Sequence, residues 1–502
     1  MFVVDKNKLK FDKDGGIKNF QDVVDKYKIE KFMSLFLLEL VNFCKEESQN
    51  NQHISKILIL FWTQLFLKIF YFVNYEEKKK KVIHYKKIIS LKKLIKAETD
   101  EIEKLLKKGP KKSGFFIKFI RRVKNLSSQT INTPNLSLKK IREINSEKNF
   151  FFSGISNEFI KFTKKQKKKF YYLHREDFFQ NINVSFKLEK NQSIFVSKLV
   201  KKINEFFKFK MNYEIDFFEK EISDYFLKTI FYTNLHIKKI LKDKSIIPKT
   251  FFVSSLSPIW TRIIANCIKL NDGEVVCLDH GSGSYLYDMT NSYYLHQDID
   301  KFITYSKKLL EYYKKGQKKF FKRKLSYSTY KLNIKNKNSI EKTMIVPFGI
   351  DNGYARLTPL PLDLAKFDLL SRTLKLLKMK NHKIILKSHP EYENEVTNKY
   401  LEKLGVEIEY EKFELLTYQA QNIIFLHPFT SLLKHALLGT NNLILFDINY
   451  PFHEFAKNIL FKNCHLINCK VTKNGRVTFN KDELWKSLAE HKKKVTNFRD
   501  FY

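Results

Sequence analysis

Acidic residues are scarce in this sequence compared with basic ones. Its 502 residues include 93 Lys and Arg but only 53 Asp and Glu, which gives a formal net charge of +40. Such a charge attracts nucleic acids, anionic membranes and phosphorylated substrates. Because no RNP, zinc-finger or helix-turn-helix pattern occurs, we expect no specific nucleic-acid partner. Lys, Ile, Asn, Phe and Tyr are abundant together, as in products of AT-rich genomes, so composition bias with some attraction to membrane surfaces is the favoured explanation.

Paired cysteines and a targeting segment are also missing. The five cysteines are scattered and form no CxxC pair, which predicts free thiols in a reducing cytosol (Cys44, Cys267, Cys277, Cys464 and Cys469). The N-terminus, Met1–Lys6, has no apolar signal-peptide region. We therefore expect a cytoplasmic protein.

Several motifs of nucleotide chemistry are absent. The sequence contains neither a P-loop nor a GxGxxG motif, which argues against a kinase or a dehydrogenase. No DxD-type pair of carboxylates follows a predicted strand, so a metal-independent reaction without a bound cofactor is the more economical hypothesis. No repeat of 20–50 residues is recognisable either.

The longest apolar run is Ile57–Val73, close to the minimum of about 17 residues for a membrane span. Polar residues interrupt it (Thr63, Gln64 and Lys68). We expect a buried core helix here, with a membrane-embedded or interfacial helix as the alternative. A basic helix at 111–124 contains three phenylalanines and can lie on an anionic membrane surface. The alternative for that helix is a solvated face with a few core anchors.

Alternating strand and helix patterns fill the rest of the chain. Short apolar strands are predicted at Thr250–Val253, Glu274–Leu278, Lys301–Tyr305, Thr343–Phe348, Lys383–Leu386, Val406–Glu409, Asn422–Phe425 and Asn442–Phe446. Helical patterns lie between them, which predicts right-handed βαβ units and parallel sheets. The fold class is therefore α/β, with two Rossmann-like domains (151–338 and 339–502) facing a cleft. A Lys-rich, helical N-terminal region (1–150) precedes them.

A polar turn follows the predicted strand Glu274–Leu278. It contains Asp279, His280, Gly281, Ser282, Gly283 and Ser284. His280 is the only side chain in this turn that titrates near neutral pH, so it can hold or transfer a proton. The glycines allow unusual backbone angles and close approach to a ligand. A plain surface turn is the competing interpretation.

Cationic and hydroxyl side chains follow strands of the last domain. Lys387 and His389 come directly after one predicted strand, and Thr430 and Ser431 follow another and begin a helix. Free N–H groups and the helix dipole favour an anion at such a position. We therefore predict a phosphate-binding edge, although a rigid His-Pro turn and a simple helix cap would look the same.

Three further charged residues follow strands of the same domain. Arg356 comes after the first strand and can contact a ligand, although a surface turn explains it as well. Asp447 and Glu454 follow the last predicted strand, where a carboxylate can bind a ribose.

The order of these motifs resembles that of a known family. The segments Asp279–Gly283, Lys387–Pro390, Thr430-Ser431 and Asn442–Asp447 are similar to those of bacterial capsule and lipopolysaccharide transferases with the two-domain GT-B fold. More distantly, they resemble the CDP-glycerol glycerophosphotransferases of teichoic-acid synthesis. The chain departs from the family pattern at Asp279, where Gln is common, and at Ser282, where Gly is common.

The resemblance implies a glycosyltransferase that builds a surface glycan from a nucleotide-activated sugar. By that resemblance His280 is the base or positions the acceptor, with Asp279 beside it. Lys387, His389, Thr430 and Ser431 would hold the donor phosphate. The expected partners are a nucleotide-sugar donor, a glycan or lipid-linked acceptor, and the anionic inner membrane. The alternatives are a polyol-phosphate transferase and a non-catalytic, membrane-associated nucleotide-binding protein.

Overall fold

We describe a computed structural model of the chain. The described residues are 2–4, 10–20, 26–47, 52–78, 85–87, 90–109, 138–144, 149–153, 169–173, 178–179, 181–253, 256, 258–278, 299–304, 326–329, 342–347, 363–387, 405–410, 413, 420–428, 441–450, 452 and 454–492.

The C-terminal part of the chain forms a seven-stranded sheet. Its strands are β9 (Thr343–Val346), β10 (Ile384–Lys387), β11 (Glu407–Glu409), β12 (Asn422–Phe425), β13 (Asn442–Asp447), β14 (His465–Val471) and β15 (Val477–Phe479). The spatial order is β11-β10-β9-β12-β13-β14-β15. The first six strands are parallel and β15 is antiparallel. In chain order the parallel strands run 3-2-1-4-5-6, the order of the dinucleotide-binding fold.

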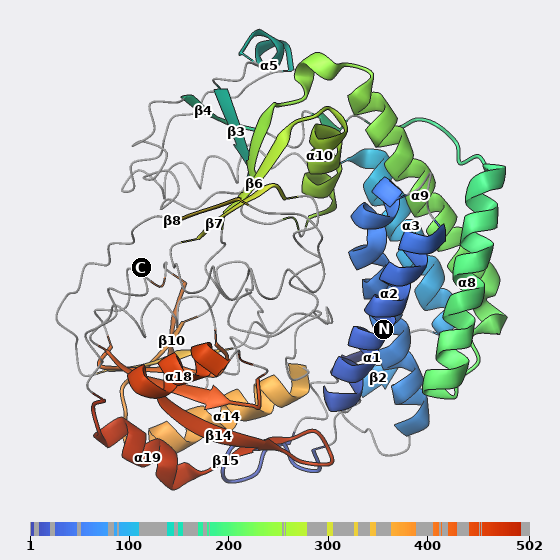
Figure 1. The fold of residues 1–502 in the computed structure, drawn as a ribbon. Helices are drawn as coiled ribbons and strands as arrows, with labels where there is room; N and C mark the ends of the chain where they lie inside the picture. Colours follow the sequence, from blue (N-terminus) through green and yellow to red (C-terminus); the bar gives the residue numbers. More distant parts are fainter. Residues whose placement is uncertain are drawn as a thin grey trace.

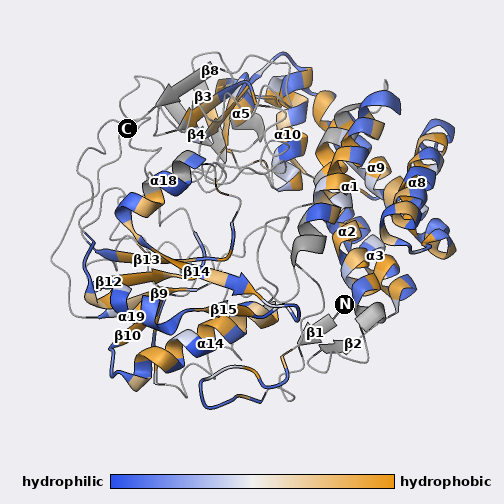
Figure 2. Cartoon of the chain, turned by 60° about the horizontal axis from the view of Figure 1, so that its bottom comes forward, coloured by the Kyte–Doolittle hydropathy of each residue, from blue (hydrophilic) through white to orange (hydrophobic). Residues whose placement is uncertain are grey.

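Helices cover both faces of this sheet. Side chains alternate between the two faces along each strand, so neighbouring residues of a strand belong to different cores. Ile345, Ile424 and Ile444 belong to the core that includes α14 (Asp363–Met379) and Leu484 of α19 (Lys481–Ala489). The residues one position earlier, Met344, Ile423 and Leu443, pack in a second core with Leu460 of α18 (Glu454–Asn463). Figure 2 shows the strands β12 and β13 as predominantly hydrophobic. The predicted parallel α/β architecture is confirmed for this half.

A second sheet contains six parallel strands from the middle of the chain. They are β3 (Asn149–Ser153), β4 (Lys169–Tyr172), β5 (Thr250–Val253), β6 (Glu274–Leu278), β7 (Lys301–Thr304) and β8 (Ser326–Thr329). Their order is β4-β3-β5-β6-β7-β8. The sequence patterns identified β5, β6 and β7 but missed β3, β4 and β8. Figure 1 shows this sheet at the top and the C-terminal sheet at the lower left.

Helices on the right of Figure 1 form a layer beside the middle sheet. They are α1 (Lys26–Glu47), α2 (Gln52–Lys78), α3 (Leu91–Lys108), α8 (Lys190–Met211) and α9 (Glu219–Leu241). Helix α10 (Ile259–Leu270) contacts both α9 and the strands β5 and β6, so it joins the layer to the sheet. Pro258 occupies its N-cap position. Smaller elements are β1 (Phe2–Val4), β2 (Tyr85–Lys87) and α5 (Leu138–Ile144).

The apolar helix α2 lies inside this layer. It is the one helix of the described chain that is long and apolar enough to cross a membrane, and 76% of its apolar window is buried in the fold. The indole Nε1 of Trp62 donates to Thr229 Oγ1 of α9 at 3.1 Å, and Phe226 packs edge-on against the indole ring. This arrangement is that of a core helix, the favoured expectation for this segment.

Residues 10–20 pack on the C-terminal sheet domain, which the sequence did not indicate. The backbone N–H of Ile17 donates to Asp368 Oδ1 of α14 at 2.7 Å, and Ser371 Oγ donates to the carbonyl of Gly15 at 2.7 Å. Asn474 Nδ2 donates to the carbonyl of Phe20 at 2.7 Å. Figure 1 shows this segment as a blue trace beside β15. The domain boundaries at 150 and 338 stay a prediction. Residues 10–20 of the predicted N-terminal region, however, contact the C-terminal part of the chain.

Candidate functional site

The candidate site lies at the carboxyl edge of the C-terminal sheet. In open parallel sheets, ligands bind outside the carboxyl ends of the strands, where the strand order reverses. Here the order reverses at β9, whose neighbours β10 and β12 continue the chain in opposite directions across the sheet. The carboxyl ends of these three strands are Val346, Lys387 and Phe425.

Lys387 is the predicted phosphate ligand that the structure describes. It is the last residue of β10 and is only 6% exposed, beside the first strand of the Rossmann order. Leu386, the residue before it, pairs with Ile345 of β9. A buried ammonium group is costly unless charged or polar groups compensate it, so its side chain belongs to a polar environment at this edge. A phosphate group is a suitable counter-charge at such a position.

An aromatic corner lies at the ends of β12 and β13. His427 Nδ1 and the Tyr450 hydroxyl are 3.2 Å apart, and the two ring centroids are 5.4 Å apart. Phe452 continues the group, with its ring centroid 5.6 Å from that of Tyr450. Tyr450 is buried, whereas His427 and Phe452 are partly exposed, so the rings of these two residues are the ones available to stack on a nucleobase. The sequence analysis missed Tyr450, whose aromatic side chain three residues after β13 was the available signal.

The turn after β13 fixes this corner. Asp447 is buried, and its Oδ1 accepts the backbone N–H of Tyr450 at 3.1 Å. Asn449, between them, has a φ of 50°, which Asn tolerates better than most residues. The Asp447 carboxylate therefore stabilises the turn that positions Tyr450. Glu454, the other carboxylate considered for a ribose, is exposed in the first turn of α18.

The remaining predicted site residues lie outside the described part of the chain. On the donor side these are Arg356, His389, Thr430 and Ser431. On the acceptor side they are Asp279, His280, Gly281, Ser282, Gly283 and Ser284. The strand before the acceptor-side turn is confirmed, because β6 ends at Leu278 between β5 and β7. The chain therefore enters that turn from the carboxyl end of a parallel strand.

Metal ligands do not gather in the described residues, among which no group of three or more His, Cys, Asp or Glu side chains could hold an ion. The five cysteines are buried, and none of them is in a disulfide bond. Burial raises the pKa of the Cys44 and Cys267 thiols to about 12, so both stay protonated at neutral pH.

Comparisons with known proteins give weak likenesses. No protein-family model matches the sequence, and no curated protein matches it significantly. Two glycosyltransferase structures align with the fold at 11% identity. The GtfA/B complex has a TM-score of 0.27, and the alignment spans about half of each chain, 48% in both cases. UGT89C1 of Arabidopsis thaliana has a TM-score of 0.34, with 70% of this chain and 84% of that chain covered. Both TM-scores are below 0.5, so neither likeness assigns the chain to a family.

Proposed function

We propose that this protein is a glycosyltransferase that moves a sugar from a nucleotide-activated donor to a surface-glycan acceptor. The observation that carries the proposal is the carboxyl edge of the C-terminal sheet. There, a strand order typical of dinucleotide-binding domains is combined with the buried Lys387 and the His427–Tyr450 corner. A second parallel sheet, with a polar turn after β6, supports an acceptor site in the other half of a GT-B-like molecule.

In the proposed reaction, an acceptor hydroxyl attacks the anomeric carbon of the sugar and the nucleoside phosphate leaves. His280 removes the proton of the hydroxyl, with Asp279 beside it, and the Gly281–Ser284 turn shapes the acceptor side. Lys387, His389, Thr430 and Ser431 hold the leaving phosphate, where fixed positive charge and N–H groups stabilise the developing negative charge. We propose that the transfer needs no metal and takes place at the cytoplasmic face of the membrane on a glycan or lipid-linked acceptor.

A thermal-shift screen with CMP, CDP, UDP and GDP tests the donor site. A nucleotide at 100 times its Kd stabilises the native state by about 2.7 kcal/mol, which is a rise of roughly 2–3 °C in Tm for a chain of this size. Lys387→Met keeps the volume of the buried side chain and removes its charge, so we expect roughly 10-fold to 100-fold weaker binding by calorimetry. The matched control is Lys383→Met, an exposed lysine just before β10. Equal affinities for wild type, Lys387→Met and Ser431→Ala would refute the donor site.

Turnover separates the proposed enzyme from its alternatives. With a donor identified by the screen, His280→Ala should lower kcat roughly 100-fold to 10,000-fold while leaving nucleotide binding unchanged. Release of CMP together with transfer of a polyol phosphate would identify the CDP-glycerol-type alternative. Nucleotide binding without any turnover would favour the non-catalytic alternative. The departures from the family pattern at Asp279 and Ser282 are the reason to test that alternative in this chain.

A further inference from the structure

Exposed apolar side chains concentrate on one flank of the helical layer. Among the described residues, nine large hydrophobic side chains are exposed, and seven of them belong to α1, α8 or the segments flanking α8 (Leu35, Leu38, Val184, Leu188, Ile194, Phe209 and Phe217). The other two, Met379 and Phe461, are on α14 and α18. Clusters of exposed apolar groups on a protein surface indicate an interaction site.

Two phenylalanines dominate this flank at the corner where α8 turns into α9. Phe209 is 79% exposed in the last turn of α8, and Phe217 is 82% exposed just before α9. In the same last turn Phe206 and Phe207 are buried and pack against Phe32 of α1. The buried pair therefore fixes the helix end, while Phe209 points to solvent and contributes little to the core.

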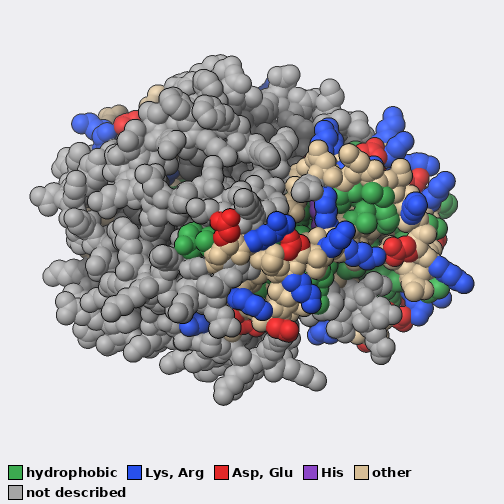
Figure 3. Space-filling view, turned by 90° about the horizontal axis from the view of Figure 1, so that it is seen from above, with side chains coloured by type: hydrophobic (Ala, Val, Ile, Leu, Met, Phe, Trp, Pro, Cys, Tyr) green, Lys and Arg blue, Asp and Glu red, His purple; other side chains and the backbone are tan. Residues whose placement is uncertain are grey.

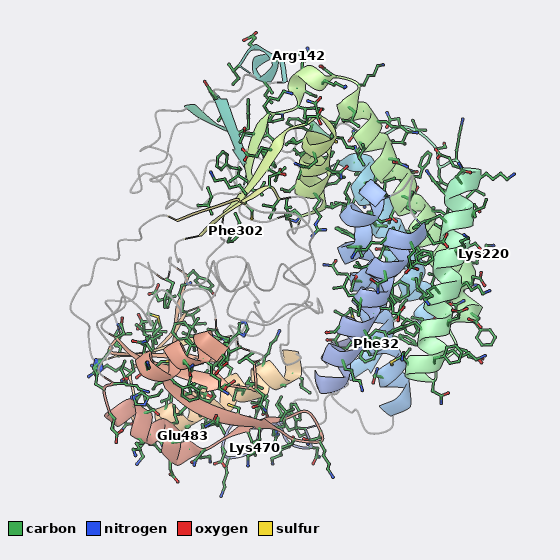
Figure 4. All side chains as sticks on the ribbon, viewed as in Figure 1. Phe32, Arg142, Lys220, Phe302, Lys470 and Glu483 are labelled. Atoms are coloured by element: carbon green, nitrogen blue, oxygen red, sulfur yellow. The ribbon has the colours of Figure 1, made fainter. Side chains whose placement is uncertain are left out.

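The same helix carries a strong positive charge. Helix α8 contains six lysines, all exposed, and Glu205 is its only acidic residue. Lys198 pairs with Glu47 at 2.6 Å, and longer contacts of 3.9 and 3.8 Å join Lys202 to Glu39 and Lys208 to Glu214. Figure 1 shows α8 at the outer right edge of the molecule, and Figure 4 shows Lys220 of α9 at the same edge. Figure 3 shows Lys and Arg side chains projecting around apolar surface in the described helical part.

The positive and apolar residues of α8 lie on one side of the helix. Spacings of three, four and seven residues place side chains on a common face. We define the α8 face as the stripe that contains Lys190, Ile194, Lys198, Lys201, Lys208 and Phe209, which joins it through Glu205, four residues before Phe209. Glu205 lies within the same stripe, so the face carries four lysines and one carboxylate.

We infer that the α8 face, together with Phe217, docks on an anionic lipid bilayer. Lysines attract anionic headgroups, and their alkyl stems extend over apolar surface while the ammonium groups stay in water. Aromatic side chains next to such lysines enter the boundary between headgroups and acyl chains. A protein partner would need acidic and apolar groups in the same order, whereas a bilayer offers both along its whole surface. The inference does not depend on the transfer reaction, because it concerns the outer flank and requires no substrate.

Vesicle flotation of the full chain tests the inference. We expect the protein to float with phosphatidylcholine vesicles that contain phosphatidylglycerol and to stay in the soluble fraction with phosphatidylcholine alone. Phe209→Ser combined with Phe217→Ser should weaken the vesicle partition coefficient at least about tenfold, because two aromatic side chains lose their apolar environment. The matched control is Met379→Ser with Phe461→Ser, which are 64% and 43% exposed elsewhere. The control should bind vesicles like the wild type.

Charge reversal provides the second arm. Lys190→Glu with Lys201→Glu should weaken binding to anionic vesicles by at least about tenfold, since each lysine near such a surface attracts it and each glutamate repels it. The same exchange at Lys470 and Lys473, exposed on the C-terminal half, is the control. Unchanged vesicle binding in both α8 double variants, or equal losses in the controls, would overturn the inference. Retention on RNA without any flotation would indicate a nucleic-acid surface instead. Nucleotide thermal shifts, measured without vesicles, report separately on the proposed function.

Discussion

The buried His236 makes the stability of the helical layer sensitive to pH. It lies on α9, where its Nε2 donates to the carbonyl of Leu106 at 2.6 Å. The rings of Phe179 and Trp260 pack edge-on against it, at centroid distances of 5.2 and 5.4 Å. Burial in this aromatic site lowers the pKa of His236 from 6.5 to about 4, because the charged imidazolium loses its hydration.

The direction of the pH effect follows from proton binding. Between pH 6.5 and 4 the unfolded chain protonates this histidine while the folded chain keeps it neutral, so the unfolded state binds more protons. Stability from this group is therefore present above pH 6.5 and is lost as the pH falls. With these two pKa values, the equilibrium constant for folding falls by a factor of roughly 30 between neutral pH and pH 5, which is about 2 kcal/mol.

The assay compares two proteins across pH, so that titration of all other groups cancels. His236→Gln keeps a side-chain N–H that can donate to the Leu106 carbonyl but cannot be protonated. The unfolding free energies of both proteins are measured by urea titration at pH 8 and pH 5. The lost ring packing should change the value of the variant, relative to the wild type, by the same amount at both pH values. The wild type should lose about 2 kcal/mol more than the variant between these two values. Parallel pH dependences in the two proteins would refute the neutral, buried state of His236.

Three further predictions concern other buried groups. Asp368 pairs with Arg372 at 2.9 Å and with Arg476 at 3.3 Å. Asp368→Ala should therefore lower the free energy of unfolding in urea by about 3–5 kcal/mol and speed tryptic cleavage at Lys18. Unchanged cleavage would contradict the docking of residues 10–20. A double-mutant cycle of Trp62→Phe and Thr229→Val should give a coupling energy of about 1 kcal/mol, and a coupling near zero would show that their hydrogen bond adds nothing. Cys44 and Cys267, with pKa values of about 12, should resist iodoacetamide in the native state at pH 8 and react in denaturant; rapid native labelling of both would contradict their burial.

The sequence predicted most of the strands whose residues are buried on both faces. Strand β12 has the predicted bounds, because a short apolar run bounded by polar residues allows little choice of register. Strand β4 was missed because its Lys169–Tyr172 run follows a dense group of lysines. Strand β14 alternates apolar and polar residues less regularly and was also missed.

The candidate site was predictable where a candidate residue stands at the end of a predicted strand. Lys387 satisfied that condition, and its position at the carboxyl edge followed from the strand alone. The aromatic corner was not predictable in this way. Tyr450 contacts His427 because of the turn after β13, which the Asp447 carboxylate stabilises. Contacts between residues far apart in the chain, such as Ile17 and Asp368, produce no local sequence pattern from which they could be predicted.

The docking of residues 10–20 has a consequence for the order of events during synthesis. Ile17 and Asp368 are 351 residues apart, so at roughly 5 to 20 residues per second the segment leaves the ribosome roughly 20 to 70 seconds before its docking surface. Ile17 and Phe20 are buried only once α14 and the β14–β15 hairpin have formed. Residues 10–20 are therefore made early but are among the last to reach their native positions, and a chain that stops before 363–479 leaves Ile17 and Phe20 exposed.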